Sequence, residues 1–524
     1  MSRLAILVSI CFVFSFIAGA EAVFAQNRTN ARLPTPEKIL DKYWKAIGGK
    51  KRAAAIRDAS FEWILHLNNE TVGVAKTQTR APDSWRSELT FANGQIITSA
   101  NASSVWSRGL DEELRTLTGA EAASVKLQAI LEATHFVNYK KFNIAARTIS
   151  TESLPEPSYG VEFSTRPGGK LVYHFSRTTG LILKTENPAN KVVTHSTNYR
   201  DVDGLKVAHE VRTTLAGQGE LTSILQKVRY NSGTPISVFD APVATVFDVA
   251  ELLRVVGRNQ DEVEKRFTEY SFFQKETDRE INSKGEIKKE TERVYEVFPI
   301  PHREPVMKLI SENGIPLPVE RAAKETKRVE EELLKAERDR EKDEAKDTRR
   351  RTERARKRAA KGESEDEDVE VSQFLRVCEF VSPRRERFRN RDAVVFDFRV
   401  RPGFRPQNRT EELISKLVGV VWIDPEDKQV MRLEARLAEG FKMVGGLLLS
   451  LRPGASVVME QTRMNEGVWL PRMAQINLSV KVLLFGGGEM NKTFEWTDYK
   501  HFKGDVKEYK IDAPKDQASA EQKP

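Results

Sequence analysis

Apolar and polar residues alternate along many short segments of this chain. The first segments to show this pattern have as their apolar residues Phe61, Trp63, Leu65 and Leu67 in SFEWILHL, Trp85, Leu89 and Phe91 in SWRSELTF, and Leu171, Tyr173 and Phe175 in KLVYHFS. A period of two with one polar face is typical of an antiparallel sheet that packs on one side only. Turn residues at Thr179–Gly180 and Asp203–Gly204 separate successive runs. The pattern therefore predicts a meander of β-hairpins.

Two segments of the first half show helical spacing instead. PTPEKILDKYWKAIGG has Thr35 as a candidate N-cap, Pro36 in the first turn and a glycine pair at its end. GAEAASVKLQAILEATHFV, at 119–137, places apolar residues on one side at helical spacing. We expect these two helices to cover the concave side of a curved sheet.

The second half of the chain repeats this order. DVAELLRVVG predicts a helix that ends at Gly257, and strand-like segments such as AVVFDFRVR follow it. TNYRDVDGLKVAHEV in the first half is matched by QTRMNEGVWLPRMAQI in the second, and FDAP at 239–242 is matched by IDAP at 511–514. A chain of 524 residues is also too long for one hydrophobic core. We infer an internal duplication, with domains at 34–242 and 247–514.

Two segments of the second half have no counterpart in the first. Residues 318–370 are charged on all sides, which indicates a helical insertion that projects as a hairpin, or else a disordered segment. Its basic end, RRRTERARKR, is interpreted as a solvated arm that could lie on an anionic surface, and not as a nucleic-acid patch. The other segment, EGFKMVGGLLLSLRPG, favours a mobile apolar flap, with a short buried helix as the alternative.

The first 25 residues have a basic start, an apolar run and small residues before Gln26. This pattern predicts a cleaved signal peptide, with a retained membrane anchor as the alternative. We therefore expect a periplasmic or secreted protein, without lipid on Cys11. No later segment has the length and hydropathy of a membrane span, so the mature chain is expected to be soluble. Residues 515–524 are expected to be a disordered tail.

Cysteine content and charge narrow the function further. After the signal peptide, Cys378 is the only cysteine, so no internal disulfide is expected. The formal net charge of +8 is modest for this length. It allows loose contact with an anionic membrane surface and does not require nucleic acid.

The residue patterns that usually identify an enzyme do not occur. There is no HExxH, GxSxG or Walker-type motif. The seven histidines are scattered, and His66, His174 and His209 stand on polar faces of separate strands, where they are either solvated or converge on a metal. Glycine-rich RPGGK and FGGGE are interpreted as hairpin turns. A pair of catalytic carboxylates, as in glycosidases, stays open as an alternative. We expect no enzyme activity, no cofactor and no metal.

The apolar side of the predicted sheets is the remaining candidate site. If the helices seal it, the interior is a core; if they lie over it as a lid, the space suits acyl chains or another hydrophobic ligand. The residues expected to line such a cavity are Trp63, Leu65, Trp85, Leu89, Phe91, Tyr173 and Phe175 in the first domain, and Phe396, Phe398, Phe441, Met443, Leu447, Leu448 and Leu449 in the second.

The same segments resemble a known family. The order of signal peptide, LDKYWKAIGG, SFEWILHL, KLVYHFSRTTGLILKTE, YRDVDGLKVAHEV and FDAP is similar to that of the periplasmic outer-membrane lipoprotein carriers of LolA and LolB type, and the second half looks like a more divergent copy. The resemblance implies an incomplete antiparallel barrel with helices over its mouth, and a lipid or lipid-modified ligand. Relatives use this barrel to sense lipoproteins or envelope stress. The tandem arrangement, the charged insertion and the absence of a match for the carriers' lid-latching arginine set this chain apart.

The sequence therefore predicts an α+β protein of two tandem incomplete antiparallel barrels. Helices cover both concave faces, and the second barrel carries the charged helical insertion. The predicted function is non-enzymatic binding of lipid, or of the acyl part of a lipoprotein, by one or both barrels. The alternative is an envelope scaffold or sensor that binds a protein partner through 320–361. A hydrolase with an unrecognised site is the third hypothesis.

Overall fold

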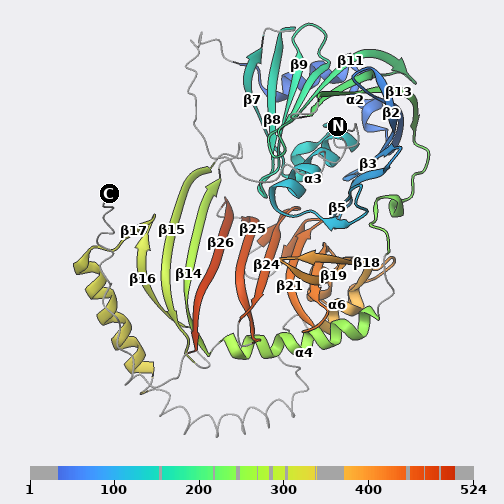
Figure 1. Ribbon diagram of the computed structural model, residues 1–524. Coiled ribbons are helices and arrows are strands. Elements are labelled where there is room, and N and C mark those ends of the chain that lie inside the picture. Colours follow the sequence, from blue (N-terminus) through green and yellow to red (C-terminus); the bar gives the residue numbers. More distant parts are fainter. Residues whose placement is uncertain are drawn as a thin grey trace, which may run out of the picture.

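The computed structural model describes residues 33–501, with gaps at 153–155, 216–218, 244–247, 268, 282–286, 301–304, 337, 339–370, 444–448, 465–466 and 483–485. The predicted signal peptide, the IDAP sequence, the predicted tail and residues 339–370 of the insertion lie outside the described residues. Within them, two antiparallel sheets of 13 strands each are joined by a short linker after Ala241 (Figure 1). The predicted class, an α+β fold with two tandem open barrels, is confirmed.

The elements of the first domain are α1 (Pro36–Ala46), α2 (Lys50–Ala54), β1 (Asp58–Leu67), β2 (Glu70–Arg80), β3 (Ser84–Phe91), β4 (Gly94–Ala100), β5 (Val105–Arg108), β6 (Leu114–Thr116), α3 (Gly119–Ala133), η3 (Tyr139–Phe142), β7 (Ala145–Glu152), β8 (Ser158–Ser164), β9 (Lys170–Ser176), β10 (Ile182–Asn187), β11 (Val192–Val202), β12 (Leu205–Leu215), β13 (Gly219–Tyr230) and η4 (Ile236–Phe239).

The elements of the second domain are α4 (Val249–Phe267), β14 (Tyr270–Ile281), β15 (Ile287–Phe298), β16 (Val306–Glu312), β17 (Ile315–Pro316), α6 (Val371–Val377), β18 (Cys378–Phe388), β19 (Arg391–Val400), α7 (Arg409–Ile414), β20 (Leu417–Asp424), β21 (Gln429–Leu437), β22 (Phe441–Met443), β23 (Leu449–Leu451), β24 (Ser456–Arg463), β25 (Trp469–Val482) and β26 (Gly486–His501). A further helix covers 319–336.

The two sheets share one topology. In the first, β1 pairs with β13 at the centre; β2–β6 lead to one edge, α3 crosses over, and β7–β12 return from the other edge. In the second, β14 pairs with β26; β15–β17 lead outward, and β18–β25 return after the segment that contains the helix 319–336. The matched sequences fall on β11–β12 and on β24–β25, which occupy equivalent positions. In both halves the first strand of the domain pairs with its last, so the repeated order of the sequence corresponds to one repeated topology.

Two helices pack on the concave face of the first sheet, which curves around α3 (Figure 1). The buried side of α1 consists of Ile39, Leu40, Tyr43 and Trp44, spaced as one helical stripe. They join buried residues of α3 and of β8 and β9 in one apolar core. The indole N–H of Trp44 also donates to the carbonyl of His135 at 2.9 Å, which ties α1 to the end of α3.

The helices α4, α6 and α7 pack together with β19 and cover part of the second sheet. Figure 1 shows α4 lying across the lower ends of its strands, and Leu253 and Val256 of α4 pack with Val394 and Phe396 of β19. The prediction that this helix ends at Gly257 is wrong, because α4 continues to Phe267. A glycine inside a helix costs only about 1 kcal/mol. Burial of Val263 in the next turns, against a cluster that includes Trp422 and Trp469, favours the longer helix.

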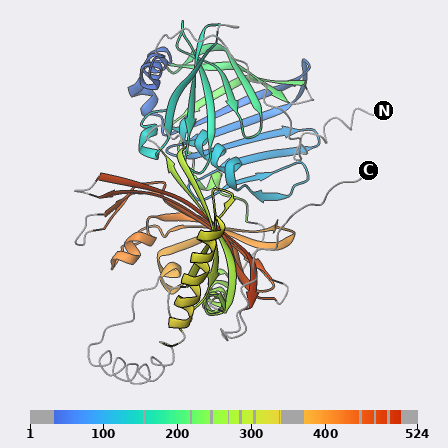
Figure 2. The same cartoon turned by 90° about the vertical axis from the view of Figure 1, so that its left-hand side faces the viewer.

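The helix 319–336 lies along the outer edge of β16, as Figure 2 shows from the side. Its Val329 and Leu333 are buried against Phe298 and Val306. Glu325 accepts from the backbone N–H of Leu309, and Arg328 donates to the carbonyl of Met307 at 2.6 Å. This contact could not be predicted from the sequence, because Val329 and Leu333 are only two apolar residues at helical spacing in a segment that is otherwise mostly charged. The helix covers an edge strand that would otherwise present unpaired backbone groups.

The FDAP sequence closes the first domain by crossing its outer face. Ser99 and the indole of Trp106 both donate to the carbonyl of Phe239 at 3.0 Å, and Asn101 donates to Asp240 at 2.9 Å. Phe239 is fully buried. The segment after β13 therefore covers β4 and β5 on the side opposite the helices.

We expect His135 to make the first domain sensitive to acid. It follows α3 in a left-handed conformation, and burial lowers the pKa of its imidazole from 6.5 to about 4. The unfolded chain therefore binds more protons between these values, so the free energy of unfolding falls as pH decreases from 6.5 to 4. Because the side chain is half-buried, we expect a loss on the order of 1–2 kcal/mol at pH 4.5. Urea unfolding followed by tryptophan fluorescence should show a smaller loss in His135→Asn; an equal loss would contradict the assignment.

Candidate functional site

The candidate site is the helix-covered face of the first sheet. Directly paired residues of antiparallel strands share a face, and the register connects Trp63 with Ala75, Ala75 with Leu89, and Leu65 with Gly73. Trp85 and Phe91 continue this face on β3, and Tyr173 and Phe175 lie on it at β9. All seven first-domain residues named from the sequence therefore lie on the face that carries α1 and α3.

These residues divide into two environments. Tyr173 and Phe175 are buried in a packed aromatic cluster, with the ring of Phe136 centred 4.9 Å and 6.0 Å from theirs. Tyr43 of α1 closes the cluster at 5.5 Å from both Phe136 and Phe175. Side chains fill this part of the interior, so it is core.

The central strands are covered less completely. Phe61 and Trp63 stack with ring centroids 6.2 Å apart and planes 27° apart, and both are half-buried. Other half-buried apolar residues on this face include Leu67, Trp85, Leu89, Phe91, Ile96, Leu221, Val228 and Tyr230. Among the residues named from the sequence, only Leu65 is fully buried here. Phe61, Leu67, Ile96, Leu221 and Val228 were not among the predicted lining residues, although the alternation in SFEWILHL already placed Phe61 and Leu67 on one face with Trp63.

Small residues run down the middle of this face. β2 contributes Gly73, Ala75 and Thr77, which pair with Leu65, Trp63 and Phe61 of β1. A Cβ at Gly73 would lie 2.2 Å from the carbonyl oxygen of Thr90, so no larger residue fits there without moving β3. Large side chains of β1 and β3 thus flank a row of small ones.

α3 is attached to this face at one polar point. The indole N–H of Trp85 donates to the carboxylate of Glu132 at 2.8 Å, and Gln128 donates to the other carboxylate oxygen, also at 2.8 Å. Burial raises the pKa of Glu132 in spite of these hydrogen bonds. α3 also makes apolar contacts with the sheet, in which Ala122 and Ala129 of the helix pack with Ala100 and Val105.

In the second domain, the predicted residues that are described are packed. Phe396, Phe398 and Phe441 are 0%, 2% and 3% exposed, and Phe398 packs with Phe374 of α6 and with Val377, Cys378 and Ile414. Of Met443 and Leu449 only the backbone is described, in a hairpin of β22 and β23. Leu447 and Leu448 lie outside the described residues. The three packed phenylalanines are therefore core residues and line no open surface.

The second sheet has a different aromatic pair on its helix-bearing face. Phe494 and Trp496 of β26 stack at 6.0 Å with planes 12° apart, and both are half-buried. The register through Ala474, Met459 and Leu433 places Phe494 on the face of Phe396. The sequence FEW at 494–496 repeats FEW at 61–63, and this identity could have revealed the pair, although β26 and β1 do not occupy equivalent positions in the two sheets. In both segments the glutamate between the rings turns to the opposite face, where Glu62 meets Arg229 and Glu495 meets Lys275.

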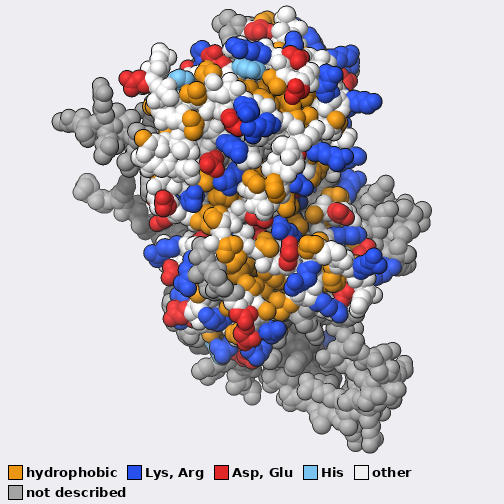
Figure 3. Space-filling view, turned by 90° about the vertical axis from the view of Figure 1, so that its right-hand side faces the viewer, with side chains coloured by type: hydrophobic (Ala, Val, Ile, Leu, Met, Phe, Trp, Pro, Cys, Tyr) orange, Lys and Arg blue, Asp and Glu red, His pale blue; other side chains and the backbone are white. Residues whose placement is uncertain are grey.

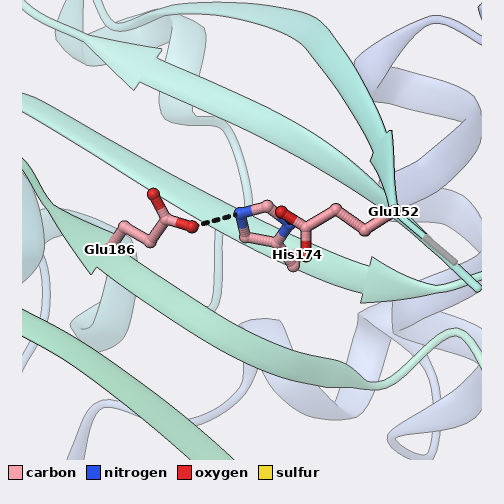
Figure 4. Close-up of side chains that lie close together, drawn as sticks. All are labelled: Glu152, His174 and Glu186. Carbon is pink, nitrogen blue, oxygen red and sulfur yellow. Dashed lines mark ion pairs between the residues drawn. The ribbon is translucent and has the colours of Figure 1, made fainter. Parts of the chain in front are cut away.

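A polar cluster lies on the outer face of the first sheet, across β7, β9 and β10 (Figure 4). His174 is 3% exposed; its Nε2 lies 3.0 Å from Glu186 and its Nδ1 lies 3.5 Å from Glu152. Lys184 lies 2.9 Å from Glu152 and 2.8 Å from Glu186. Burial and the neighbouring ammonium lower the pKa of His174, while the hydrogen bonds of Lys184 to both carboxylates raise its pKa against the effect of burial.

This cluster does not fit a metal ion. Glu152 lies beside Nδ1 of His174 and Glu186 lies beside Nε2, so the two carboxylates contact different nitrogens of the ring. The ammonium of Lys184 forms ion pairs with both carboxylates and offsets their charge. The arrangement is an ion-pair network that joins three strands. His66 and His209, the other histidines considered from the sequence, contact Thr71 and the carbonyl of Val207 on other strands, so the three do not converge.

A cavity of about 310 Å³ lies where the two sheets meet, between β6 and the strands β18 and β19, of which β18 is at the edge of the second sheet. Arg115, Arg385 and Arg387 line it together with Glu113, Glu386 and Asp392. The charges balance, so the cavity attracts neither sign, and none of the predicted apolar residues lines it. The surface in Figure 3 also intermixes Lys and Arg with Asp and Glu. Among the described residues, no helix has the length and hydropathy needed to span a membrane.

No family model and no curated protein matches this chain. Among solved structures, a LolA superfamily protein from Nitrosomonas europaea is 11% identical, with a TM-score of 0.28, and the match covers 40% of this chain and 98% of that one. A DUF1329 family protein from Desulfovibrio piger is 11% identical, with a TM-score of 0.27, and covers 39% and 96%. A chain of the Pseudomonas aeruginosa MucA/MucB complex is 7% identical, with a TM-score of 0.18, and covers 87% and 94%. The LolA superfamily is the one that the sequence resembles. Because these identities and TM-scores are low, the proposals below rest on the chain's own residues.

Proposed function

We propose that this chain is an exported, non-enzymatic protein of the cell envelope that binds the hydrophobic chain of a lipid or lipid-modified protein. The binding surface is a strip on the concave face of the first sheet. The strip consists of the half-buried apolar residues Phe61, Trp63 and Leu67 of β1 and Trp85, Leu89 and Phe91 of β3, and of the small residues Gly73, Ala75 and Thr77 between them. The observation that carries the proposal is that this strip is only half-buried, although it lies on the face that two helices cover. Exposed apolar surface costs about 25 cal/mol per Å², so an acyl chain that covers the strip gains this free energy.

The composition of the strip supports an acyl chain as the ligand. The large side chains of β1 and β3 are apolar, and the row between them contains Gly73, Ala75 and Thr77. None of these residues is charged, and the one carboxylate that touches this face, Glu132, is already occupied by Trp85 and Gln128. A long, thin, apolar ligand fits a row of small residues flanked by large ones.

The experiment measures binding of a dansylated undecanoic acid to the full chain by tryptophan-to-dansyl energy transfer. Replacing Trp63 with serine removes half of the stacked pair, and we expect a loss of affinity of about tenfold or more, as for truncation of an aromatic anchor worth roughly 1.4 kcal/mol. Ile64→Ser is the matched control, because Ile64 is also half-buried and points to the opposite face. Wild-type protein that binds no probe, or equal losses in the two variants, would contradict the proposal.

The second sheet offers a second stacked aromatic pair, which has more polar neighbours: Phe494 is paired with Glu276, and the indole of Trp496 donates to Gln274 at 2.9 Å. Phe494 and Trp496 are also stacked and half-buried, and Val457, two strands away on the same face, is 39% exposed. We include this strip in the proposal as a second, weaker acyl-chain surface, since it has no equivalent of α3 above it among the described helices. The same titration tests it, with a stoichiometry of two for the wild type and one for Trp496→Ser.

A further inference from the structure

The second domain contacts the first at the turn between β4 and β5. The side chain of Asn101 shapes this turn by accepting from the backbone N–H groups of Ser103 and Ser104, both at 2.9 Å. Ser104 then donates to Asp397 of β19 at 2.6 Å, and Ser103 donates to the carbonyl of Phe398 at 3.2 Å. Asn101, Ser103 and Ser104 are at most 4% exposed, and Ala102 is half-buried. The turn is thus enclosed by the second sheet.

The same turn holds the middle of α3. Lys126 of α3 donates to the carbonyl of Ser103 at 3.0 Å. On the other side, Arg436 of β21 donates to the carbonyl of Ala102 at 3.0 Å through Nε and forms an ion pair with Asp83 at 3.0 Å. The turn therefore lies between the helix and the second sheet, and polar contacts run without a break from Lys126 through the turn to Arg436.

The start of α3 is held in the same way. Thr116 lies three residues before the helix begins; its backbone N–H donates to Glu386 of β18 at 2.9 Å, and its hydroxyl accepts from Arg384. Arg384 is fully buried and is fixed in turn by Asp397 at 3.0 Å. The second domain consequently fixes α3 at two points, one at its N-terminus and one at its middle.

We propose that the second domain holds α3 closed over the apolar face of the first sheet, and that loosening this contact admits the ligand. The proposal rests on the proposed function for the role of that face. Glu132, nearer the end of α3, touches the strip through Trp85, so a displacement of α3 changes the cover of Trp85 and its neighbours. Arg436 is a positioning residue in this arrangement and does not touch the strip.

The test replaces Arg436 with glutamine in the full chain, which removes the ion pair to Asp83. Asp83→Asn removes the same pair from the first domain and should behave alike. Arg463→Gln is the control, because Arg463 forms its ion pair with Asp427 inside the second domain. We expect amide hydrogen exchange of 119–133 to be about tenfold faster in the first two variants, since a hydrogen bond to a charged group contributes that factor or more, and unchanged in the control.

The second readout is the association rate of dansylated undecanoic acid, which should rise severalfold in Arg436→Gln and Asp83→Asn. Unchanged amide exchange in α3 would overturn the proposal, whether or not the association rate of the dansylated fatty acid changes. Faster exchange with an unchanged association rate, in a protein that binds the probe, would overturn the role in ligand access. If wild-type protein binds no probe, the proposed function fails, and the exchange rates alone decide whether the second domain holds α3.

Discussion

Replacing Asp397 with alanine is expected to lower the free energy of unfolding by about 3–5 kcal/mol. The carboxylate is fully buried; it accepts from Arg384 at 3.0 Å and from Ser104 at 2.6 Å. Its removal leaves the guanidinium of Arg384, also fully buried, with Glu386 as its remaining carboxylate partner. A buried charge that loses a partner cannot regain water in exchange, so the cost greatly exceeds that of losing a surface ion pair.

Urea unfolding by circular dichroism measures this effect. Asp392→Ala, on the same strand, is the matched control, because Asp392 is exposed and its loss should change stability by less than about 0.5 kcal/mol. The contact between domains should weaken as well, because Ser104 loses its acceptor. Equal stabilities for the two variants would show that the network around Arg384 does not hold the domains together.

Phe136→Ala should have a similar effect inside the first domain, with a loss of about 3–5 kcal/mol. The ring is 3% exposed and has four aromatic neighbours, with centroids 4.9 Å from Tyr173, 5.4 Å from Phe163, 5.5 Å from Tyr43 and 6.0 Å from Phe175. The cavity left behind opens between α1 and the sheet, and the surrounding rings are held by their own strands, so the site collapses poorly.

Thermal unfolding is the measurement for this variant. Phe142→Ala serves as the control, since Phe142 is half-buried at the margin of the same core and should cost clearly less. If Phe136→Ala were as stable as Phe142→Ala, the cluster could not be the packed core described here, and the first domain would have unfilled space beneath α1.

The alternation of apolar residues predicted the strands and the face to which they point. Trp63, Trp85 and Tyr173 share one face because side chains alternate along a strand, whatever the tertiary structure. The repeated order of helix, strands and closing sequence predicted two copies of one topology. These features are local or repetitive, so they can be read from single segments.

The state of the apolar face could not be predicted in the same way. Phe396 and Phe398 are core residues, whereas Phe61 and Trp63 are half-buried. A packed strand face and a half-buried one both have alternating apolar side chains, so the sequence pattern does not distinguish them. The difference depends on where α3, α6 and α7 come to lie, which is a tertiary property. The contacts of Arg384 and Arg436 with the first domain join residues more than 260 positions apart, and nothing in their local sequence indicates the partner.

The most direct test of ligand binding on the first sheet is photo-crosslinking of the full chain with a fatty acid that carries a diazirine near its methyl end, followed by peptide mass spectrometry. The account predicts that labelled residues lie on the helix-covered face of β1–β4 and β13, with Phe61 and Trp63 among them, and that unlabelled palmitic acid competes. Labels confined to the opposite face, or no label that palmitic acid displaces, would contradict it.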